Sequence, residues 1–163
     1  MEPLYSLKGI TKQFRSGKVN FTALKGIDFE CYAGDVVALT GPSGSGKSTL
    51  LNVLGMIEEP TGGSLEFCGE RITGKRDYDV TQLRRNAVGF IFQNFNLFPI
   101  LSAVENVEFS LMLEGSVSKP EMRSRALDVM KSLEIDKYAS HRPAELSGGQ
   151  RQRVAIARAI VKR

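Results

Sequence analysis

The sequence has no tryptophan, a single histidine and only two cysteines among its 163 residues. Because Cys31 and Cys68 lie far apart and form no C-x-x-C pair, neither a disulfide scaffold nor a zinc site is expected, and two reduced, packed thiols are the better interpretation. No apolar run approaches the roughly 18 residues of a membrane-spanning helix. The first residues, Met1-Glu2-Pro3, lack the basic and apolar regions of a secretory signal, so we expect a cytosolic protein.

Basic charge is not spread evenly along the chain. The chain carries 22 Lys and Arg against 18 Asp and Glu, a net charge of +4, yet the segment from residue 142 onward has six basic side chains and one acidic one. The first 141 residues are therefore close to neutral. Nucleic-acid-binding proteins usually spread basic charge over a whole face. A single basic helix is the better interpretation, and we expect no nucleic-acid partner.

Hydrophobic residues at 42% and charged residues at 25% are typical of one soluble globular domain of this length. The expected strands, from alternating or continuous apolar runs, cover residues 4–14, 27–31, 36–40, 64–68 and 88–92. The run over 36–40 is largely apolar and rich in β-branched residues, which is typical of a strand covered on both faces of a parallel sheet. The expected helices cover residues 47–55, 103–113, 118–133 and 150–161. The third of them is expected to begin with a capping box at Ser118 and Glu121.

The segment Gly41-Pro42-Ser43-Gly44-Ser45-Gly46-Lys47-Ser48 fits the pattern G-x-x-x-x-G-K-[ST] at every fixed position. Glycines permit the positive φ angles and the close approach with which backbone N–H groups converge on phosphate oxygens at a helix N-terminus. Lys47 is placed to bridge the β- and γ-phosphates of a nucleotide, and Ser48 Oγ is placed to ligate Mg²⁺. The spacing is not the G-x-G-x-x-G of dinucleotide-binding turns, so NAD is not expected.

A second glycine-containing turn, Leu146-Ser147-Gly148-Gly149-Gln150, precedes the basic helix. A serine hydroxyl and two glycine amides at a helix N-terminus can form another anion site, although the same residues could also serve only as a helix cap. With the first loop, LSGGQ and the following RQR resemble the signature of the ATP-binding-cassette (ABC) ATPases. Phe92-Gln93 lies between the motifs, where that family has its Q-loop glutamine. GPSGSGKST, FQNFNL and AVENV resemble the lipoprotein-release and macrolide-export group most.

The resemblance covers the whole chain and implies an α/β fold. It implies a P-loop NTPase core with an antiparallel β subdomain and an α-helical signature subdomain, the C-terminal part of the core being absent. Residues 1–163 would then be the N-terminal part of a single ABC ATPase domain. Its expected parts are a β subdomain with the P-loop core over residues 1–93 and a helical subdomain over residues 94–150. A signature helix that returns to the core is expected over residues 151–163.

The resemblance also implies which residues bind Mg-ATP. Phe14 takes the position of the aromatic residue that stacks on adenine, a core phenylalanine being the alternative. Gln93 would position the attacking water and, with Ser48, hold Mg²⁺. The phosphates would be bound by Gly41, Ser43, Gly44, Ser45, Gly46, Lys47, Ser48 and Thr49. The γ-phosphate held by an opposite subunit would be contacted by Ser147, Gly148, Gly149 and Gln150.

As partners, the resemblance implies a second ABC ATPase subunit, in a head-to-tail homodimer around two ATP molecules, and a transmembrane permease subunit that would meet residues 96–99. Such a subunit would be cytoplasmic and peripheral on the inner face of the cell membrane. The family's Mg²⁺-anchoring Asp, catalytic Glu and switch histidine follow the signature helix and have no counterpart here, since His141 precedes it. We therefore expect ATP hydrolysis by the complete subunit but not by this segment, which is expected to be a fragment of a longer chain.

Other functions remain open on the sequence alone. SMC-type DNA-maintenance ATPases also pair a phosphate loop with an SGG signature, but they place a long coiled coil between the two, and residues 47–147 show no heptad run. A soluble ABC-type translation factor would need two tandem cassettes. A non-hydrolysing regulatory module that binds ATP and dimerises would fit a chain that naturally ends at Arg163.

Overall fold

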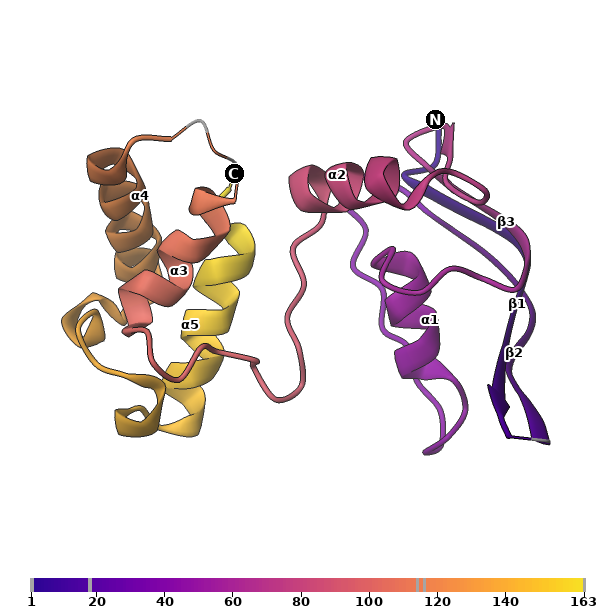
Figure 1. Ribbon diagram of the computed structural model, residues 1–163, viewed down its shortest axis with the longest axis horizontal. Coiled ribbons are helices and arrows are strands. Elements are labelled where there is room, and N and C mark those ends of the chain that lie inside the picture. Colours follow the sequence, from indigo (N-terminus) through magenta and orange to yellow (C-terminus); the bar gives the residue numbers. More distant parts are fainter. Residues whose placement is uncertain (1, 18, 114, 116, 163) are drawn as a thin grey trace. The chain divides into compact units, whose positions relative to one another are not determined.

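Two compact units make up the computed structural model, which describes residues 2–17, 19–113, 115 and 117–162 (Figure 1). The first unit ends at Arg84 and the second begins at Arg85. Within the described ranges, no helix has both the length and the apolar character needed to cross a lipid bilayer.

The first unit is built on an antiparallel sheet of four strands in the order β2-β1-β3-β4. The strands are β1 (Tyr5–Ser16), β2 (Val19–Cys31), β3 (Gly62–Phe67) and β4 (Glu70–Arg71). Leu7 and Ile10 are both buried although they are three residues apart, because the register of β1 on β2 shifts between them. The predicted strands over 4–14, 27–31 and 64–68 are thereby confirmed.

Two helices accompany this sheet. The predicted helix over 47–55 is confirmed as α1 (Lys47–Leu54), which contacts β2 and buries Val53 completely. A further helix, α2 (Asp77–Ala87), was not expected. It buries none of its residues, so its sequence shows no apolar stripe at helical spacing from which it could be recognised.

The predicted strands over 36–40 and 88–92 are wrong, because the chain forms no strand at either segment. Val36 is 99% exposed, and Val37 and Ile91 are about half exposed. A strand exists only where a neighbouring strand completes its hydrogen-bond ladder. Neither segment has such a neighbour among the described residues, so β-branched composition alone does not produce a strand.

The second unit is helical. Its helices are α3 (Ala103–Met112), α4 (Lys119–Ser132) and α5 (Gly148–Ile160), with short 3₁₀ turns η1 (Asp136–Tyr138) and η2 (Pro143–Glu145). The three α-helices pack against one another around a core that includes Val104, Leu111, Met130 and Val154. All three predicted helices of this unit are confirmed. The capping box expected at Ser118 is wrong, since that residue is the N-cap of α4 but its side chain makes no capping hydrogen bond.

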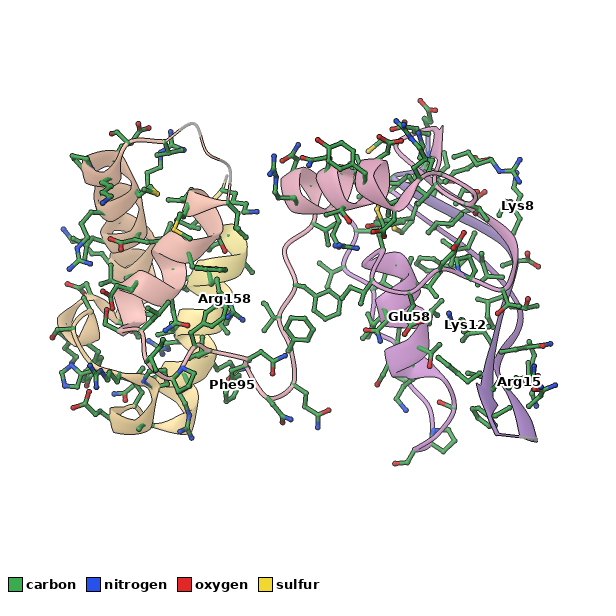
Figure 2. All side chains as sticks on the ribbon, in the orientation of Figure 1. Lys8, Lys12, Arg15, Glu58, Phe95 and Arg158 are labelled. Carbon is green, nitrogen blue, oxygen red and sulfur yellow. The ribbon has the colours of Figure 1, made fainter. Side chains whose placement is uncertain are left out.

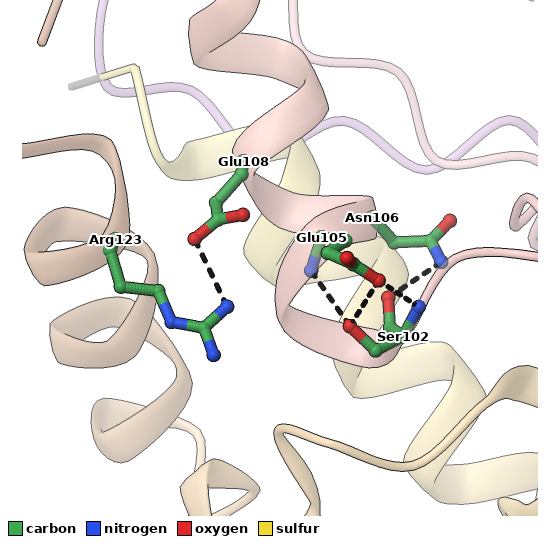
Figure 3. A network of polar contacts seen from close by, with 5 residues as sticks. All are labelled: Ser102, Glu105, Asn106, Glu108 and Arg123. Carbon is green, nitrogen blue, oxygen red and sulfur yellow. Dashed lines mark hydrogen bonds and ion pairs between the residues drawn. The ribbon is translucent and has the colours of Figure 1, made fainter. Parts of the chain in front are cut away.

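A polar network fixes the start of α3 (Figure 3). Asn106 is fully buried, and its Oδ1 accepts a hydrogen bond of 2.7 Å from the Phe98 N–H. Its Nδ2 lies 2.9–3.1 Å from the carbonyl oxygens of Phe98, Leu101 and Ser102. A buried amide with all its polar atoms bonded is stabilising, whereas an unbonded one is costly. Asn106 therefore ties the turn before α3 to the helix itself.

Ser102 and Glu105 form a capping box beside Asn106 (Figure 3). The Glu105 carboxylate accepts hydrogen bonds of 2.6 Å from the Ser102 hydroxyl and 2.7 Å from the Ser102 N–H. These bonds favour the ionised form, so they lower the pKa of Glu105 below its usual value. One turn further on, Glu108 pairs with Arg123 of α4 at 3.2 Å.

Candidate functional site

The phosphate loop, residues 41–46, has the backbone that its glycines predict. The φ angles of Gly41, Gly44 and Gly46 are 144°, 78° and 90°. A Cβ at Gly46 would lie 2.6 Å from the Ala23 carbonyl oxygen, so no other residue fits there without movement. A Cβ at Gly44 would meet nothing within 4 Å, so only its φ favours glycine. The loop therefore packs directly against β2.

Gly46 is also the N-cap of α1, and as a glycine it provides no side-chain cap. The first turn of α1 has no acidic residue either. The first N–H groups of a helix have no partner within the helix, and the positive end of the helix dipole favours an anion. This helix start is therefore suited to a phosphate group.

The Lys47 ammonium lies inside the curve of the loop. Its Nζ donates hydrogen bonds to the carbonyl oxygens of Gly41 at 2.9 Å and Pro42 at 2.7 Å, and lies 3.4 Å from Ser45 Oγ. An ammonium has three protons to donate. A phosphate oxygen would therefore compete with the acceptors of the loop for these protons.

Beside the loop and β2 lies an open hollow of about 220 Å³, which we call the loop hollow. It is lined by Phe21, Ala23, Gly44, Gly46, Lys47, Ser48 and Thr49. No group of three or more His, Cys, Asp or Glu in the described ranges could hold a metal by itself. Mg²⁺ is commonly held by one or two protein oxygens together with phosphates and waters. The Ser48 hydroxyl fits that arrangement, with the phosphates as the main ligands.

The other loop residues predicted to bind phosphate do not line the loop hollow. Gly41 and Ser45 line a neighbouring hollow of about 270 Å³, and Ser43 is exposed in the loop.

Phe14 lies on β1 directly opposite Phe21 of β2. It is 39% exposed and therefore not a core residue, so its stacking role stays a prediction. Lys12 Nζ lies 5.2 Å from the centroid of the Phe14 ring. The same ammonium is 2.7 Å from a Glu58 carboxylate oxygen and from the Glu59 carbonyl oxygen (Figure 2). Phe14 is not among the residues that line the loop hollow.

Gln93 belongs to the second unit, whereas Ser48 belongs to the first. It lines a hollow of about 310 Å³ together with neighbouring residues of the chain and with Pro143 and Arg151. The roles predicted for Gln93, on Mg²⁺ and on the attacking water, stay predictions.

Two residues after Gln93 the backbone is strained. Phe95 and Asn96 have φ angles of 61° and 45°, a region that non-glycine residues rarely occupy. The Arg158 guanidinium donates hydrogen bonds of 2.6 Å to the carbonyl oxygens of both residues (Figure 2). Burial lowers the pKa of Arg158. Arg158 thus anchors the strained turn, a role that sequence reasoning missed because the partners are 62 and 63 residues apart.

Ser147 begins α5 with a complete capping box. Its Oγ accepts a hydrogen bond of 3.3 Å from the Gln150 N–H, and Gln150 Oε1 accepts one of 2.7 Å from the Ser147 N–H. A helix cap is the alternative that the sequence leaves open for these residues, and the S-x-x-Q spacing is the signal that predicts it. Because Oγ acts here as an acceptor, the Ser147 hydroxyl proton remains able to bond an anion.

The two glycines after Ser147 are open to the outside. A Cβ added at Gly148 or Gly149 would meet nothing within 4 Å. Gly149 and Gln150 also line a hollow of about 510 Å³, whose other lining residues include Tyr138 and Arg153. Nothing in the described chain requires glycine at these two positions.

The chain is similar to known proteins. It matches the family described as ABC transporter over residues 24–163. It is 43% identical, over 160 residues, to the uncharacterized ABC transporter ATP-binding protein MJ0796 of Methanocaldococcus jannaschii, covering 96% of this chain and 68% of that protein. It is 45% identical, over 159 residues, to the macrolide export ATP-binding/permease protein MacB of Azoarcus sp., covering 98% of this chain but only 24% of that protein.

Solved structures show the same similarity. The dimeric structure of the MJ0796 ATP-binding cassette in a post-hydrolysis state, bound to ADP and Pi, matches with a TM-score of 0.91 and 43% identity. The match covers 97% of this chain and 69% of that one. The predicted α/β fold of a P-loop NTPase is confirmed by this match.

Proposed function

The chain belongs to the ABC transporter family as an ATP-binding cassette, and we propose that it couples ATP to transport through a nucleotide shared between two copies. In this proposal Mg-ATP lies between residues 41–49 of one copy and residues 147–150 of the other, in a head-to-tail homodimer. Within one ABC ATPase domain, we propose that the chain divides into the parts 1–93, 94–150 and 151–163.

One observation carries the proposal: the chain has two glycine-containing helix starts of different construction. The start of α1 is uncapped, with Lys47 inside the loop. The start of α5 is capped from within, but its glycines face open space. The first is suited to hold phosphates alone, and the second to approach phosphates that another copy holds. The related MJ0796 cassette, whose structures are described as dimeric, supports this division.

Magnesium, hydrolysis and the membrane partner extend the proposal. Ser48 and Gln93 hold Mg²⁺, and Gln93 orients the attacking water. Hydrolysis of the bound ATP is part of the proposal. A transmembrane permease subunit is the partner, which holds the cassette at the cytoplasmic face of the cell membrane. Relatives named ATP-binding/permease proteins, of which this chain matches 24%, support that partner.

Calorimetric titration of the full chain with ATP and Mg²⁺ tests the central binding step. Lys47→Ala is expected to weaken ATP binding by about a hundredfold, because hydrogen bonds from a charged group to phosphate are each worth roughly 1.5–3 kcal/mol. The matched control is Lys131→Ala, which removes an exposed ammonium from the last turn of α4 and should leave ATP affinity unchanged. ATP binding of equal strength by the parent and Lys47→Ala would contradict the proposal.

A further inference from the structure

Gln93 belongs to a loop whose two legs are both attached to the last turn of α5. We call residues 89–96 the glutamine loop. In its first leg, a Cβ at Gly89 would lie 2.5 Å from the Ala159 carbonyl oxygen, so no other residue fits there without movement. Glycine permits such a close approach of one backbone to another. Gly89 therefore fixes where the first leg lies on α5.

The second leg is attached by Arg158, the neighbour of Ala159 in α5. The Arg158 guanidinium donates hydrogen bonds of 2.6 Å to the carbonyl oxygens of Phe95 and Asn96 (Figure 2). Hydrogen bonds from a charged donor are roughly twice as strong as neutral ones, and the planar guanidinium holds both carbonyl groups in one geometry. These bonds offset the cost of the positive φ angles of Phe95 and Asn96.

The two attachments share one rigid base, because Arg158 and Ala159 are consecutive residues of the same helix. Gln93 lies between the two legs and is exposed. Its position is therefore set by the backbone of the glutamine loop and not by burial of its own side chain. A change at either attachment should move Gln93 without altering the phosphate loop.

We propose that Arg158 and Gly89 are positioning residues, which hold Gln93 where it can ligate the Mg²⁺ of a bound nucleotide. This inference rests on the proposed Mg²⁺ role of Gln93 and adds the two residues that maintain it. Both act through the backbone of the glutamine loop and not by contact with the metal. Groups that orient a metal ligand matter almost as much as the ligand, since their loss typically weakens metal binding about 10- to 100-fold.

Titrations with and without Mg²⁺ isolate this effect. Calorimetry of the full chain with a non-hydrolysable ATP analogue gives one affinity in Mg²⁺ and one in EDTA, and we call their quotient the magnesium ratio. Gln93→Ala should lower the magnesium ratio about tenfold. Arg158→Lys keeps the charge but not the planar guanidinium, and Gly89→Ala forces the first leg away from α5. Each should lower the ratio by about three- to tenfold.

The affinity in EDTA should change by less than about twofold in all three variants, because they leave the phosphate loop intact. The matched control is Arg123→Lys, which changes an arginine that pairs with Glu108 at 3.2 Å, elsewhere in the second unit. It should leave both affinities unchanged. Unfolding would lower the two affinities alike, so the magnesium ratio stays informative even if a variant is less stable.

A double variant distinguishes action through Gln93 from a general structural role. If Arg158 acts only through Gln93, Gln93→Ala combined with Arg158→Lys should have the magnesium ratio of Gln93→Ala alone, within about twofold. Independent effects would multiply instead. The cycle therefore measures whether the two residues contribute to the same interaction.

Hydrogen exchange, measured without nucleotide or metal, reports the glutamine loop directly. The Phe95 N–H donates a hydrogen bond of 2.9 Å to the Phe92 carbonyl oxygen within the loop. In Arg158→Lys, exchange of the Phe95 amide should become about tenfold faster, because the loop opens more often. Amides in the middle of α4 should keep their exchange rates. An unchanged rate at Phe95 would show that Arg158 does not hold the loop and would overturn the inference.

The outcomes of the titrations separate the two levels of the proposal. If the parent does not bind the analogue, the proposed function fails. If Gln93→Ala keeps the magnesium ratio of the parent, the proposed role of Gln93 fails and the inference fails with it. If Gln93→Ala lowers the ratio but Arg158→Lys or Gly89→Ala leaves it unchanged, only the inference is overturned. It is likewise overturned if the effects multiply in the double variant, or if Arg158→Lys weakens binding equally in Mg²⁺ and in EDTA.

Discussion

The starts of α1 and α5 carry similar residues but are built in different ways. At α1, Gly46 is required by the fold itself, because its φ is 90° and a Cβ would collide with the Ala23 carbonyl oxygen. At α5, Gly148 and Gly149 have ordinary backbone angles and free space around them, and the side chains of Ser147 and Gln150 already cap the helix.

The difference indicates where each glycine is needed. The phosphate loop is complete within one copy of the chain, and its glycines maintain its own backbone. The glycines of α5 have no such purpose within the chain, so a close approach from outside is what they permit. Substitutions at the two turns should therefore separate stability from assembly, and their effects on the free energy of unfolding should follow a definite order.

Gly46→Ala should have the largest effect. The methyl group meets a backbone oxygen and the residue must keep a left-handed φ, so we expect a loss of about 2–4 kcal/mol in the free energy of unfolding and no measurable ATP binding. Urea denaturation measures the loss. Gly44→Ala is the matched control, since its Cβ meets nothing, and should lose only about 1 kcal/mol.

Ser147→Ala should have an intermediate effect. It removes the hydroxyl that caps α5, which is worth about 1 kcal/mol. Ser102→Ala removes the equivalent group from α3 and should cost a similar amount. A Ser147→Ala variant as stable as the parent in urea denaturation would show that the cap of α5 does not contribute to stability. It would contradict the contrast between a capped α5 and an uncapped α1.

The capping boxes of α3 and α5 should differ slightly in how their contributions to the free energy of unfolding depend on pH. The folded-state pKa of Glu105 is lowered, chiefly by the Ser102 hydroxyl, so its contribution is complete above the unfolded-state pKa of about 4.3 and is lost as pH falls through the folded-state value. Since Glu105 is exposed, we expect its contribution to the free energy of unfolding to be less than about 0.5 kcal/mol. Glu105→Gln, which imitates the Gln150 box, should lose this part of the pH dependence in unfolding curves at pH 3–6; an unchanged pH dependence would contradict the assignment.

Gly149→Ala should have the smallest effect on stability and a clear effect on assembly. Because alanine is a better helix former than glycine and meets no neighbour, the free energy of unfolding should stay constant or rise slightly. Nucleotide-dependent dimerisation should weaken about tenfold, since an added methyl group in a close contact costs roughly 1–3 kcal/mol. Sedimentation in the presence of a non-hydrolysable ATP analogue measures the dimerisation. Unchanged dimerisation would show that the start of α5 does not contact the nucleotide.

Local patterns predicted most of the elements because the interactions that form them are local. The helices over 103–112 and 148–160 and the strands around residues 7, 29 and 65 follow from apolar periodicity, and the loop at 41–46 from its glycines. Residues 36–40 show the limit, because a strand depends on a neighbour that its own composition does not specify.

The parts of the site that were missed depend on contacts between distant segments. Arg158 reaches Phe95 and Asn96 across more than 60 residues, and Phe21 enters the wall of the loop hollow only because the loop packs on β2. Neither contact has a sequence pattern. The cap at Ser147, by contrast, has one in its S-x-x-Q spacing.

Complementation between two defective variants tests most directly whether two copies share each nucleotide. Lys47→Ala disables the phosphate loop, and Gly149→Asp places a carboxylate where α5 would meet phosphate. Neither variant alone should dimerise with Mg²⁺ and a non-hydrolysable ATP analogue. In a mixed head-to-tail dimer, however, one of the two sites combines an intact loop with an intact α5 start. The account predicts that mixing the variants yields nucleotide-dependent dimers in sedimentation experiments, and a mixture that stays monomeric would contradict it.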